Sequence, residues 1–218
     1  MHAERKPFSE VVTIYPSSME EKSRRAEYAE ATRTALVDAG RDLFAEKGFA
    51  ETSTEEIVRK ARVTRGALYH HFTGKSDLFE AVVEGMEEDI LKEILESASA
   101  TAGPWEFITR GADAFLDACL DPAVQRILLA DAPAVLGLEK WREMDLRYSL
   151  GTTQQALQAG MDAGVIDKQP VEPLAHMLMG ALHNAAHYIV DSDDPLQARK
   201  TAGKTLKRLL EGLRQDVS

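Results

Sequence analysis

Residues 43–82 read LFAEKGFAETSTEEIVRKARVTRGALYHHFTGKSDLFEAV, and the breaks in this stretch decide the fold. Apolar residues recur at helical spacing up to Gly48, which ends the run. The hydroxyls of residues 52–54 and of Thr64 are suited to cap the helices that follow, and Thr73-Gly74 is a further break. We therefore expect a helix ending near Gly48, short helices over residues 54–61 and 65–72, and a long amphipathic helix over residues 76–99.

Three short helices with tight turns, followed by a long helix, have the dimensions of a helix-turn-helix module. In such a module the second helix of the pair, here residues 65–72, enters the major groove of double-stranded DNA, and its first residues meet the base edges. A hydroxyl, a cation, small residues, polar rings and a phosphate-binding ammonium or backbone N–H suit that role. They are supplied by Thr64, Arg65, Gly66, Ala67, Tyr69, His70, His71 and Lys75.

The length and composition are typical of a single globular domain, or of two small domains that share a core. Its 218 residues are 44% hydrophobic and 28% charged, and no apolar run approaches the roughly 18–20 residues of a membrane span. The single cysteine, Cys119, excludes an internal disulfide and favours a reducing compartment. Residues 1–26 lack the apolar core of a signal peptide, so we expect a cytoplasmic protein without membrane contact.

The net charge of −10 is unevenly distributed. Residues 1–80 hold 13 Lys/Arg and 14 Asp/Glu, whereas residues 81–218 hold 13 and 22. A local basic patch in the almost neutral N-terminal third can still bind phosphate. We expect its non-specific DNA binding to be weak and sensitive to salt.

The rest of the chain consists of helical patterns separated by Gly and Pro. The one strand candidate, residues 11–15, ends at a proline and has no partner, so we expect a flexible extension over residues 1–23. The fold class is therefore all-α, with about nine helices. We expect a helix-turn-helix DNA-binding domain over residues 24–75 and a larger helical domain over residues 76–218.

From Thr34 to Val82 the sequence resembles the TetR family of tetracycline-repressor-like regulators. GALYHHF at residues 66–72 and KSDLF at residues 75–79 look like the family's recognition helix and the beginning of its fourth helix. The family's turn often carries Gly where this chain has Arg62. A left-handed backbone at that position would cost about 1 kcal/mol for a residue with a side chain.

The resemblance implies a two-fold symmetric homodimer that represses transcription. It also implies release from operator DNA when a small-molecule effector binds to the C-terminal domain, residues 76–218. The phosphate contacts that it implies are Thr54, Tyr69, His70 and Lys75. The base or groove contacts that it implies are Thr64, Arg65, Gly66 and Ala67.

We expect the dimer interface on the last two helices. Residues 173–190 are apolar on nearly every side. A helix of this kind is buried on two faces. We expect one face to pack within its own chain and the other against a second subunit. Small residues allow helices to approach closely, and two helices from each chain form a four-helix bundle around a two-fold axis. The interface residues that we predict are Gly180, Ala185, Gly203, Leu206, Leu210 and Leu213.

A ligand cavity is expected among residues 103–120, 138–163 and 173–190, which are rich in aromatic residues and methionine. Each of these side chains alone is equally consistent with core packing, and the resemblance favours a pocket. The residues that we predict to line it are Trp105, Phe115, Trp141, Met144, Tyr148, Met177 and His183. The polar groups nearby are Asp113, Asp117, Asp145, His183 and His187. These favour a largely apolar ligand of modest size, neutral or cationic.

Other functions have weaker support. There is no Gly-rich phosphate loop, G-x-S-x-G elbow or H-E-x-x-H pattern, so we expect neither an enzyme nor a cofactor. His176, His183 and His187 share one helix face, but a metal needs a further ligand from elsewhere, and we predict no metal site. Two alternatives stay open: a helical enzyme, and a regulator or binding module controlled by a protein partner without a small-molecule inducer.

Overall fold

The computed structural model describes residues 24–99 and 103–214, which form the all-α fold that the sequence predicts. The flexible extension expected over residues 1–23 lies outside the described residues. The described part contains ten α-helices and one π-helical segment, η2 (Gln125–Asp131). The α-helices are α1 (Arg24–Glu51), α2 (Thr54–Ala61), α3 (Arg65–His71), α4 (Lys75–Ser99), α5 (Pro104–Ala118), α6 (Pro122–Val124), α7 (Ala132–Leu136), α8 (Leu138–Asp162), α9 (Val171–Val190) and α10 (Pro195–Glu211). None of the described helices is long and apolar enough to cross a membrane.

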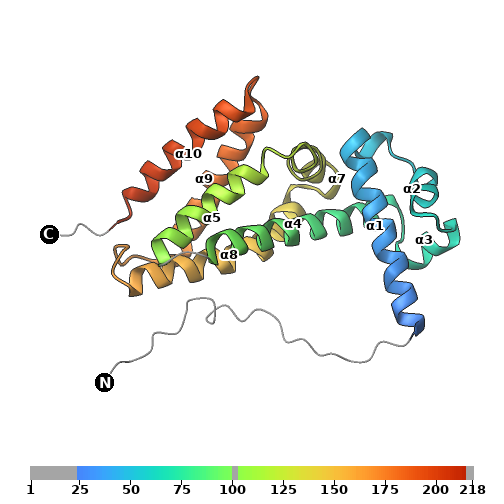
Figure 1. Cartoon of the computed structure of the whole chain (residues 1–218), viewed down its shortest axis with the longest axis horizontal. Helices are drawn as coiled ribbons and strands as arrows, with labels where there is room; N and C mark the ends of the chain where they lie inside the picture. The colour runs from blue at the N-terminus through green and yellow to red at the C-terminus, as the bar shows by residue number, and fades with distance from the viewer. Residues whose placement is uncertain (1–23, 100–102, 215–218) are drawn as a thin grey trace.

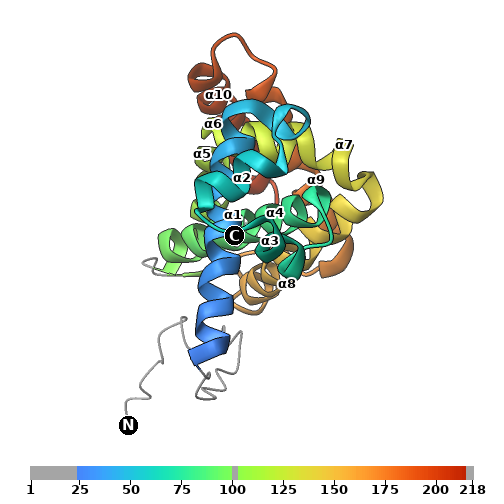
Figure 2. The same ribbon diagram turned by 90° about the vertical axis from the view of Figure 1, so that its right-hand side faces the viewer.

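The molecule is elongated, with α1, α2 and α3 at one end (Figure 1). α4 leaves this end and runs into the other part of the molecule, where α5 and α8 pack along it and α9 and α10 lie beyond. Viewed from the side of the N-terminal helices, α2 and α3 lie in front of the remaining helices (Figure 2). α3 is therefore at a free end, where a large partner can approach it.

Side-chain caps fix where α2 and α3 begin. The Ser53 hydroxyl accepts a hydrogen bond from the N–H of Glu56, and the Glu56 carboxylate accepts one from the N–H of Ser53, which is a capping box. Lys47 donates to the same carboxylate, and this bond together with those from Ser53 lowers the pKa of Glu56 to about 2. Thr64 caps α3 by accepting from the N–H of Ala67.

The turn between α2 and α3 contains a left-handed residue that has a side chain. Arg62 has φ 57° and ψ 37°, and its N–H donates to the carbonyl of Arg59 to end α2. Among the described residues it is the one non-glycine with positive φ. The left-handed conformation considered from the sequence is therefore present at Arg62, and so is its cost of about 1 kcal/mol.

Two clusters of buried side chains hold the fold together. The first contains Phe44, Leu68 and Phe79 and continues into η2, α7 and the first turns of α8. The second joins α5, the rest of α8, α9 and α10. α4 contributes Met86 to the first cluster and Ala98 to the second, so one helix is built into both.

Replacing Arg62 with Gly should stabilise the protein. Glycine adopts φ 57° without steric cost, and this gain slightly exceeds the extra entropy that glycine gives to the unfolded chain, for a net increase of up to about 0.5 kcal/mol. Urea denaturation of the full chain should show a higher midpoint with an unchanged slope. Arg59→Gly, at an exposed position inside α2, is the control and should lower stability by about 1 kcal/mol. A loss of stability in both variants would contradict the argument.

Candidate DNA-binding interface and ligand cavity

α3 separates its apolar and polar residues onto two faces. Leu68 and Phe72 are buried in the first core cluster. The exposed residues at its start and along its outer face are Thr64, Arg65, Gly66, Tyr69 and His70. Ala67 and, at the start of α2, Thr54 are half-buried. This arrangement suits a helix that rests on the domain core and presents its other face to a groove.

Neighbouring side chains hold the guanidinium of Arg65 at the surface. It lies 5.5 Å from the centre of the Tyr69 ring and 3.2 Å from the Glu55 carboxylate. The Arg65 and Glu55 side chains are 64% and 60% exposed, so their ion pair contributes at most about 1 kcal/mol. A phosphate or a base edge can therefore displace Glu55.

The ammonium of Lys75 binds within the chain. Nζ donates to the carbonyl of Phe49 at 2.8 Å and to that of Thr52 at 2.9 Å, and it lies 4.2 Å from the centre of the Phe49 ring. These carbonyls follow the end of the straight part of α1, where a cation is favourable. The sequence suggested two phosphate donors at Lys75, its ammonium and its backbone N–H. Because the ammonium binds carbonyls of the chain, the backbone N–H at the beginning of α4 is the donor that stays available for a phosphate.

A kink at Gly48 brings the end of α1 against η2. Gly48 has φ 81°, a conformation that glycine adopts at low cost. Just beyond the kink, the N–H of Phe49 donates to the carboxylate of Asp131 at 2.8 Å. The segment that leads into α2 is thus fastened to η2 through Asp131 and to α4 through Lys75.

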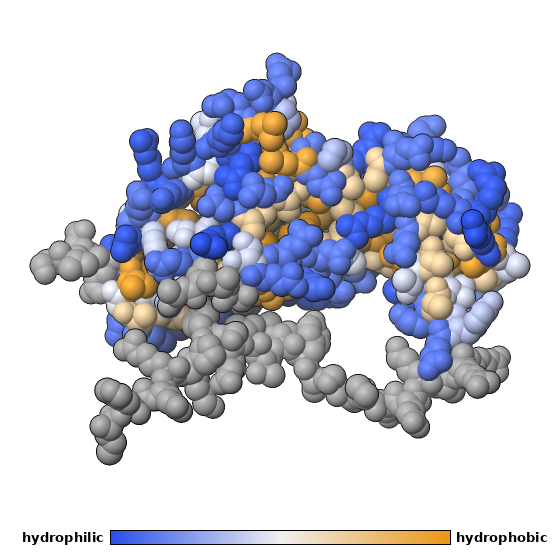
Figure 3. All heavy atoms as spheres, in the orientation of Figure 1, coloured by the Kyte–Doolittle hydropathy of each residue, from blue (hydrophilic) through white to orange (hydrophobic). Residues whose placement is uncertain are grey.

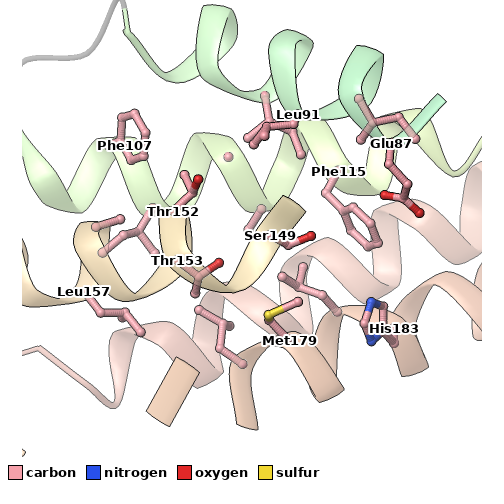
Figure 4. A pocket seen from close by; sticks show the side chains of 18 residues that line it. Glu87, Leu91, Phe107, Phe115, Ser149, Thr152, Thr153, Leu157, Met179 and His183 are labelled. Atoms are coloured by element: carbon pink, nitrogen blue, oxygen red, sulfur yellow. The ribbon is translucent and has the colours of Figure 1, made fainter. Parts of the chain in front are cut away.

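The second candidate site is a cavity of about 100 Å³ between α4, α5, α8 and α9. Figure 4 shows Glu87, Phe115 and His183 gathered at one end of it. Apolar side chains line most of the remainder, among them Leu91, Phe107, Leu157 and Met179. α8 adds the hydroxyls of Ser149, Thr152 and Thr153. An apolar cavity with a few polar groups at one end is typical of a small-molecule site.

The polar end of the cavity is built from an acid and an imidazole. Glu87 and His183 are the ionisable groups among the described residues that line it. Burial, with a smaller contribution from the nearby charge of Glu87, raises the pKa of the Cys119 thiol to about 12. The His183 ring packs against Phe115 and Trp141, with ring centres 6.3 Å and 5.9 Å apart.

Both parts of the chain are similar to known proteins. Residues 36–82 match the bacterial regulatory proteins of the tetR family, and residues 105–213 match a tetracyclin repressor-like C-terminal domain. A TetR-family transcriptional regulator from Pectobacterium atrosepticum superposes with a TM-score of 0.78 at 32% identity, over 88% of this chain and 98% of that one. The chain belongs to the tetR family.

Two further relatives of this tetR-family protein are similar over most of their length. The TetC protein of transposon Tn10 from Escherichia coli is 28% identical, over 78% of this chain and 86% of TetC. SmeT in complex with triclosan shares the fold, with a TM-score of 0.65 at 22% identity over 86% of this chain and 93% of SmeT.

Two of the seven side chains predicted for the cavity of this tetR-family protein, Phe115 and His183, line it. Trp105 lies partly buried against the second core cluster, with the Arg214 guanidinium 5.0 Å from its ring centre. Met177 is 72% exposed, because it stands on the side of α9 opposite the buried Met179. Trp141, Met144 and Tyr148 pack on the first core cluster, because the first turns of α8 lie against α4 and α7.

Asp113 and Asp117, considered as polar groups of the pocket, bind Arg199 of α10 instead. Its guanidinium donates to Asp117 at 2.6 Å and to Asp113 at 3.0 Å, which ties α10 to α5. His187 is exposed, and the side chain of Asp145 lies outside the described residues. Nowhere in the described ranges do three His, Cys, Asp or Glu residues form a group that could hold a metal ion.

The cavity has a wall from α4 that the sequence did not predict, and its α8 wall lies one to two turns beyond the predicted Trp141, Met144 and Tyr148. Glu87 and Leu91 belong to α4, which lies outside the three ranges in which the cavity was expected. Ser149, Thr152, Thr153 and Ala156 follow the i, i+3, i+4, i+7 spacing of one helix face. That spacing indicates one face of a helix lined by small polar residues, which is a weaker signal for a cavity wall than a cluster of aromatic residues.

The predicted interface residues of α10 lie largely inside the chain. Leu206 and Leu210 are 4% and 2% exposed in the second core cluster, and Leu213 packs against the same cluster. A side chain at Gly203 would meet Arg199. Leu206 and Leu210 are turned inward because they cover α5 and α9, whereas Leu209 of the same helix is 61% exposed.

The outer face of α9 is more exposed. Gly180 faces open space, and Ala185 is half-buried. Apolar surface lies near the turn between α9 and α10 (Figure 3), where Leu196 is 63% exposed. The side chains that follow one outward stripe of α9, at i, i+4, i+7 and i+11, are Met177, Ala181, Asn184 and Tyr188.

Lys75→Met should lower the free energy of unfolding by about 1–3 kcal/mol, because carbonyls at the end of α1 lose a charged donor. Methionine keeps the apolar stem and removes the ammonium. Lys60→Met is the control, since the exposed pair of Lys60 with Asp42 contributes at most about 1 kcal/mol. Urea denaturation compares the two variants. An equal, small effect of both would show that the Lys75 contact is not structural.

Proposed function

We propose that this protein is a homodimeric repressor that binds a pseudo-palindromic operator and is released from it by a small, largely apolar ligand. The observation that carries the proposal is the course of α4. Its first part, with Phe79 and Met86, is buried in the core that supports α3. Its second part, with Glu87 and Ile94, lines the cavity. One helix therefore belongs to both sites.

The size of the cavity supports a coupled movement. Sites for small molecules have volumes of about 300–1,000 Å³, whereas the cavity here holds about 100 Å³. A ligand larger than this space pushes α4 away from α5 and α8. Because Lys75 joins α4 to the end of α1, α3 moves with it, and the ligand favours a conformation with low operator affinity.

We place the dimer interface on the outer face of α9. Ala181 and Gly180 allow close approach at its centre, and Met177 and Tyr188, which are 72% and 55% exposed, supply apolar surface. A two-fold axis through this face sets two copies of α3 on the same DNA. Such dimers contact half-sites about 34–36 Å apart, one turn of the double helix.

The complex of SmeT with triclosan, a relative in fold, supports a ligand response in this architecture. Calorimetry tests the response with ligands selected from a chemically diverse library by thermal shift. A coupling of about 1–3 kcal/mol lowers operator affinity roughly 5–150-fold, and operator DNA lowers ligand affinity by the same factor. Equal ligand affinity with and without operator would contradict release. Release by a protein partner alone would favour the alternative regulator.

Arg65→Ala and Tyr69→Phe should weaken operator binding in different ways. Arg65, at the start of α3, reads a base, so its loss should remove the preference at one base pair, with a cost there of about 1–3 kcal/mol. Tyr69 contacts a phosphate, so its loss should weaken binding about equally on all sequences. Fluorescence anisotropy with operators substituted at single positions measures both. Arg142→Ala, exposed on α8, is the control. An equal loss at every position for Arg65→Ala would exclude base reading.

Ala181→Arg should abolish dimerisation and operator binding. It puts a charge at the centre of the proposed interface on α9, where desolvation without a partner is unfavourable. Light scattering measures the oligomeric state, and circular dichroism checks that the helices persist. Gln155→Arg, at an exposed position on α8, is the matched control and should stay dimeric. A dimeric Ala181→Arg protein would show that the interface lies elsewhere.

A further inference from the structure

Two threonine hydroxyls in the wall of the cavity are not used by the fold. Thr152 and Thr153 lie in the middle of α8 and line the cavity, and neither hydroxyl takes part in a hydrogen bond within the described part of the chain. A helix offers a threonine the carbonyl four residues earlier as an acceptor. On α5 Thr109 donates to the carbonyl of Trp105 at 3.1 Å, and on α10 Thr201 bonds in the same way at 3.0 Å. The two cavity threonines leave this acceptor unused.

These threonines lie away from the ionisable end of the cavity. Figure 4 shows them on α8 toward Phe107, whereas Glu87 and His183 lie at the other end. A polar group that enters an apolar cavity is stabilised only where it finds hydrogen bonds. At Thr152 and Thr153 a ligand finds them without displacing a contact that the chain already makes.

The charges around the cavity select an uncharged ligand. None of the described residues that line it is a lysine or an arginine, and Glu87 adds an acid. An anion therefore finds no counter-charge there and is repelled. A cation held at the threonines loses its water at the end of the cavity opposite Glu87, where an unpaired charge is unfavourable. An uncharged oxygen avoids both penalties.

The volume of the cavity, about 100 Å³, limits the ligand to about one ring. An apolar cavity of about 150 Å³ holds benzene, so a single ring enters with a small displacement of the helices. A carbonyl oxygen has two lone pairs and can accept two hydrogen bonds. We infer that the cavity binds an uncharged ligand of about one ring, whose carbonyl or hydroxyl oxygen accepts from Thr152 and Thr153. The inference rests on the proposed ligand response and deepens it by naming the ligand class.

Calorimetry on the full chain without DNA tests the ligand class with four probes of one shape: acetophenone, α-methylstyrene, benzoate and protonated benzamidine. The group on the ring is a ketone, its hydrocarbon counterpart, an anion and a cation. Acetophenone should bind about tenfold more tightly than each of the others, because only its oxygen is uncharged and accepts hydrogen bonds. Equally tight binding of any other probe, or no detectable binding of acetophenone, would overturn the inference.

The double variant Thr152→Val, Thr153→Val removes both hydroxyls and keeps the branched shape of the side chains. Its preference for acetophenone over α-methylstyrene should be about tenfold smaller than that of the unaltered chain. Thr109→Val is the matched control, since this hydroxyl is bonded to the backbone of α5, and it should leave the preference unchanged. Binding of α-methylstyrene by the double variant shows that its cavity is intact. An unchanged preference in the double variant would overturn the role of the threonines.

A spectroscopic measurement leaves both threonines in place. The infrared carbonyl stretch of isotope-labelled acetophenone should lie at lower frequency in the complex with the full chain than in a hydrocarbon solvent, because hydrogen bonds weaken the C=O bond. The same frequency in both surroundings would overturn the inference even where the double variant fails to fold.

Operator affinity in the presence of acetophenone separates this inference from the proposed function. Acetophenone that binds with the expected preference but leaves operator affinity unchanged would overturn the proposed release and support the ligand class. Operator release by a charged ligand, with no binding of acetophenone, would overturn the ligand class and support the proposed release.

Discussion

The ammonium of Lys75 binds carbonyl oxygens at the end of α1, and the placement of the DNA-binding helices depends on this contact. α1 kinks at Gly48 so that the chain can turn into α2, and a helix end leaves carbonyls without helical partners. Lys75 supplies their donor from the first turn of α4. Asp131 supplies the acceptor for the N–H of Phe49 from η2. The turn is therefore held between a cation and an anion that come from different parts of the chain, and α1, α4 and η2 are fixed relative to one another.

The proposed ligand response needs a mechanical connection between the small N-terminal unit and the distant cavity, and this constraint supplies one. A unit of this size buries too little surface for a large core of its own. Its core continues instead into η2, α7 and the first turns of α8, where Trp141 and Met144 are buried. α4 passes through that core before it reaches the cavity, so a displacement at the cavity repacks the core and does not merely bend a linker. Packed cores change between discrete arrangements, which converts a small displacement into a change of state.

The sequence predicts most helices because their boundaries are local. The caps at Ser53 and Thr64 act within three residues, and the recognition helix follows from them. What the sequence could not predict depends on distant neighbours. An apolar helix offers several apolar faces, and only the packing of other helices turns Leu206 inward and Met177 outward. The partners of Lys75 lie 23–26 residues earlier in the chain, and no periodic pattern marks them. η2 likewise has no cap or period that distinguishes a π-helix from an α-helix.

The negative charge of the chain determines how large a coupling free energy the proposed switch needs. The net charge is −10, and one groove beside α4 and α5 is lined by five acidic side chains and two arginines, while Arg65 on α3 already faces Glu55. Repulsion of this kind keeps non-specific attraction to the phosphate backbone small. In the proposed dimer, operator affinity then depends on the simultaneous fit of two α3 helices, and a change in their spacing removes the contribution of one half-site. A coupling of about 1–3 kcal/mol is therefore sufficient for the proposed release, and a small ligand that displaces α4 can supply it.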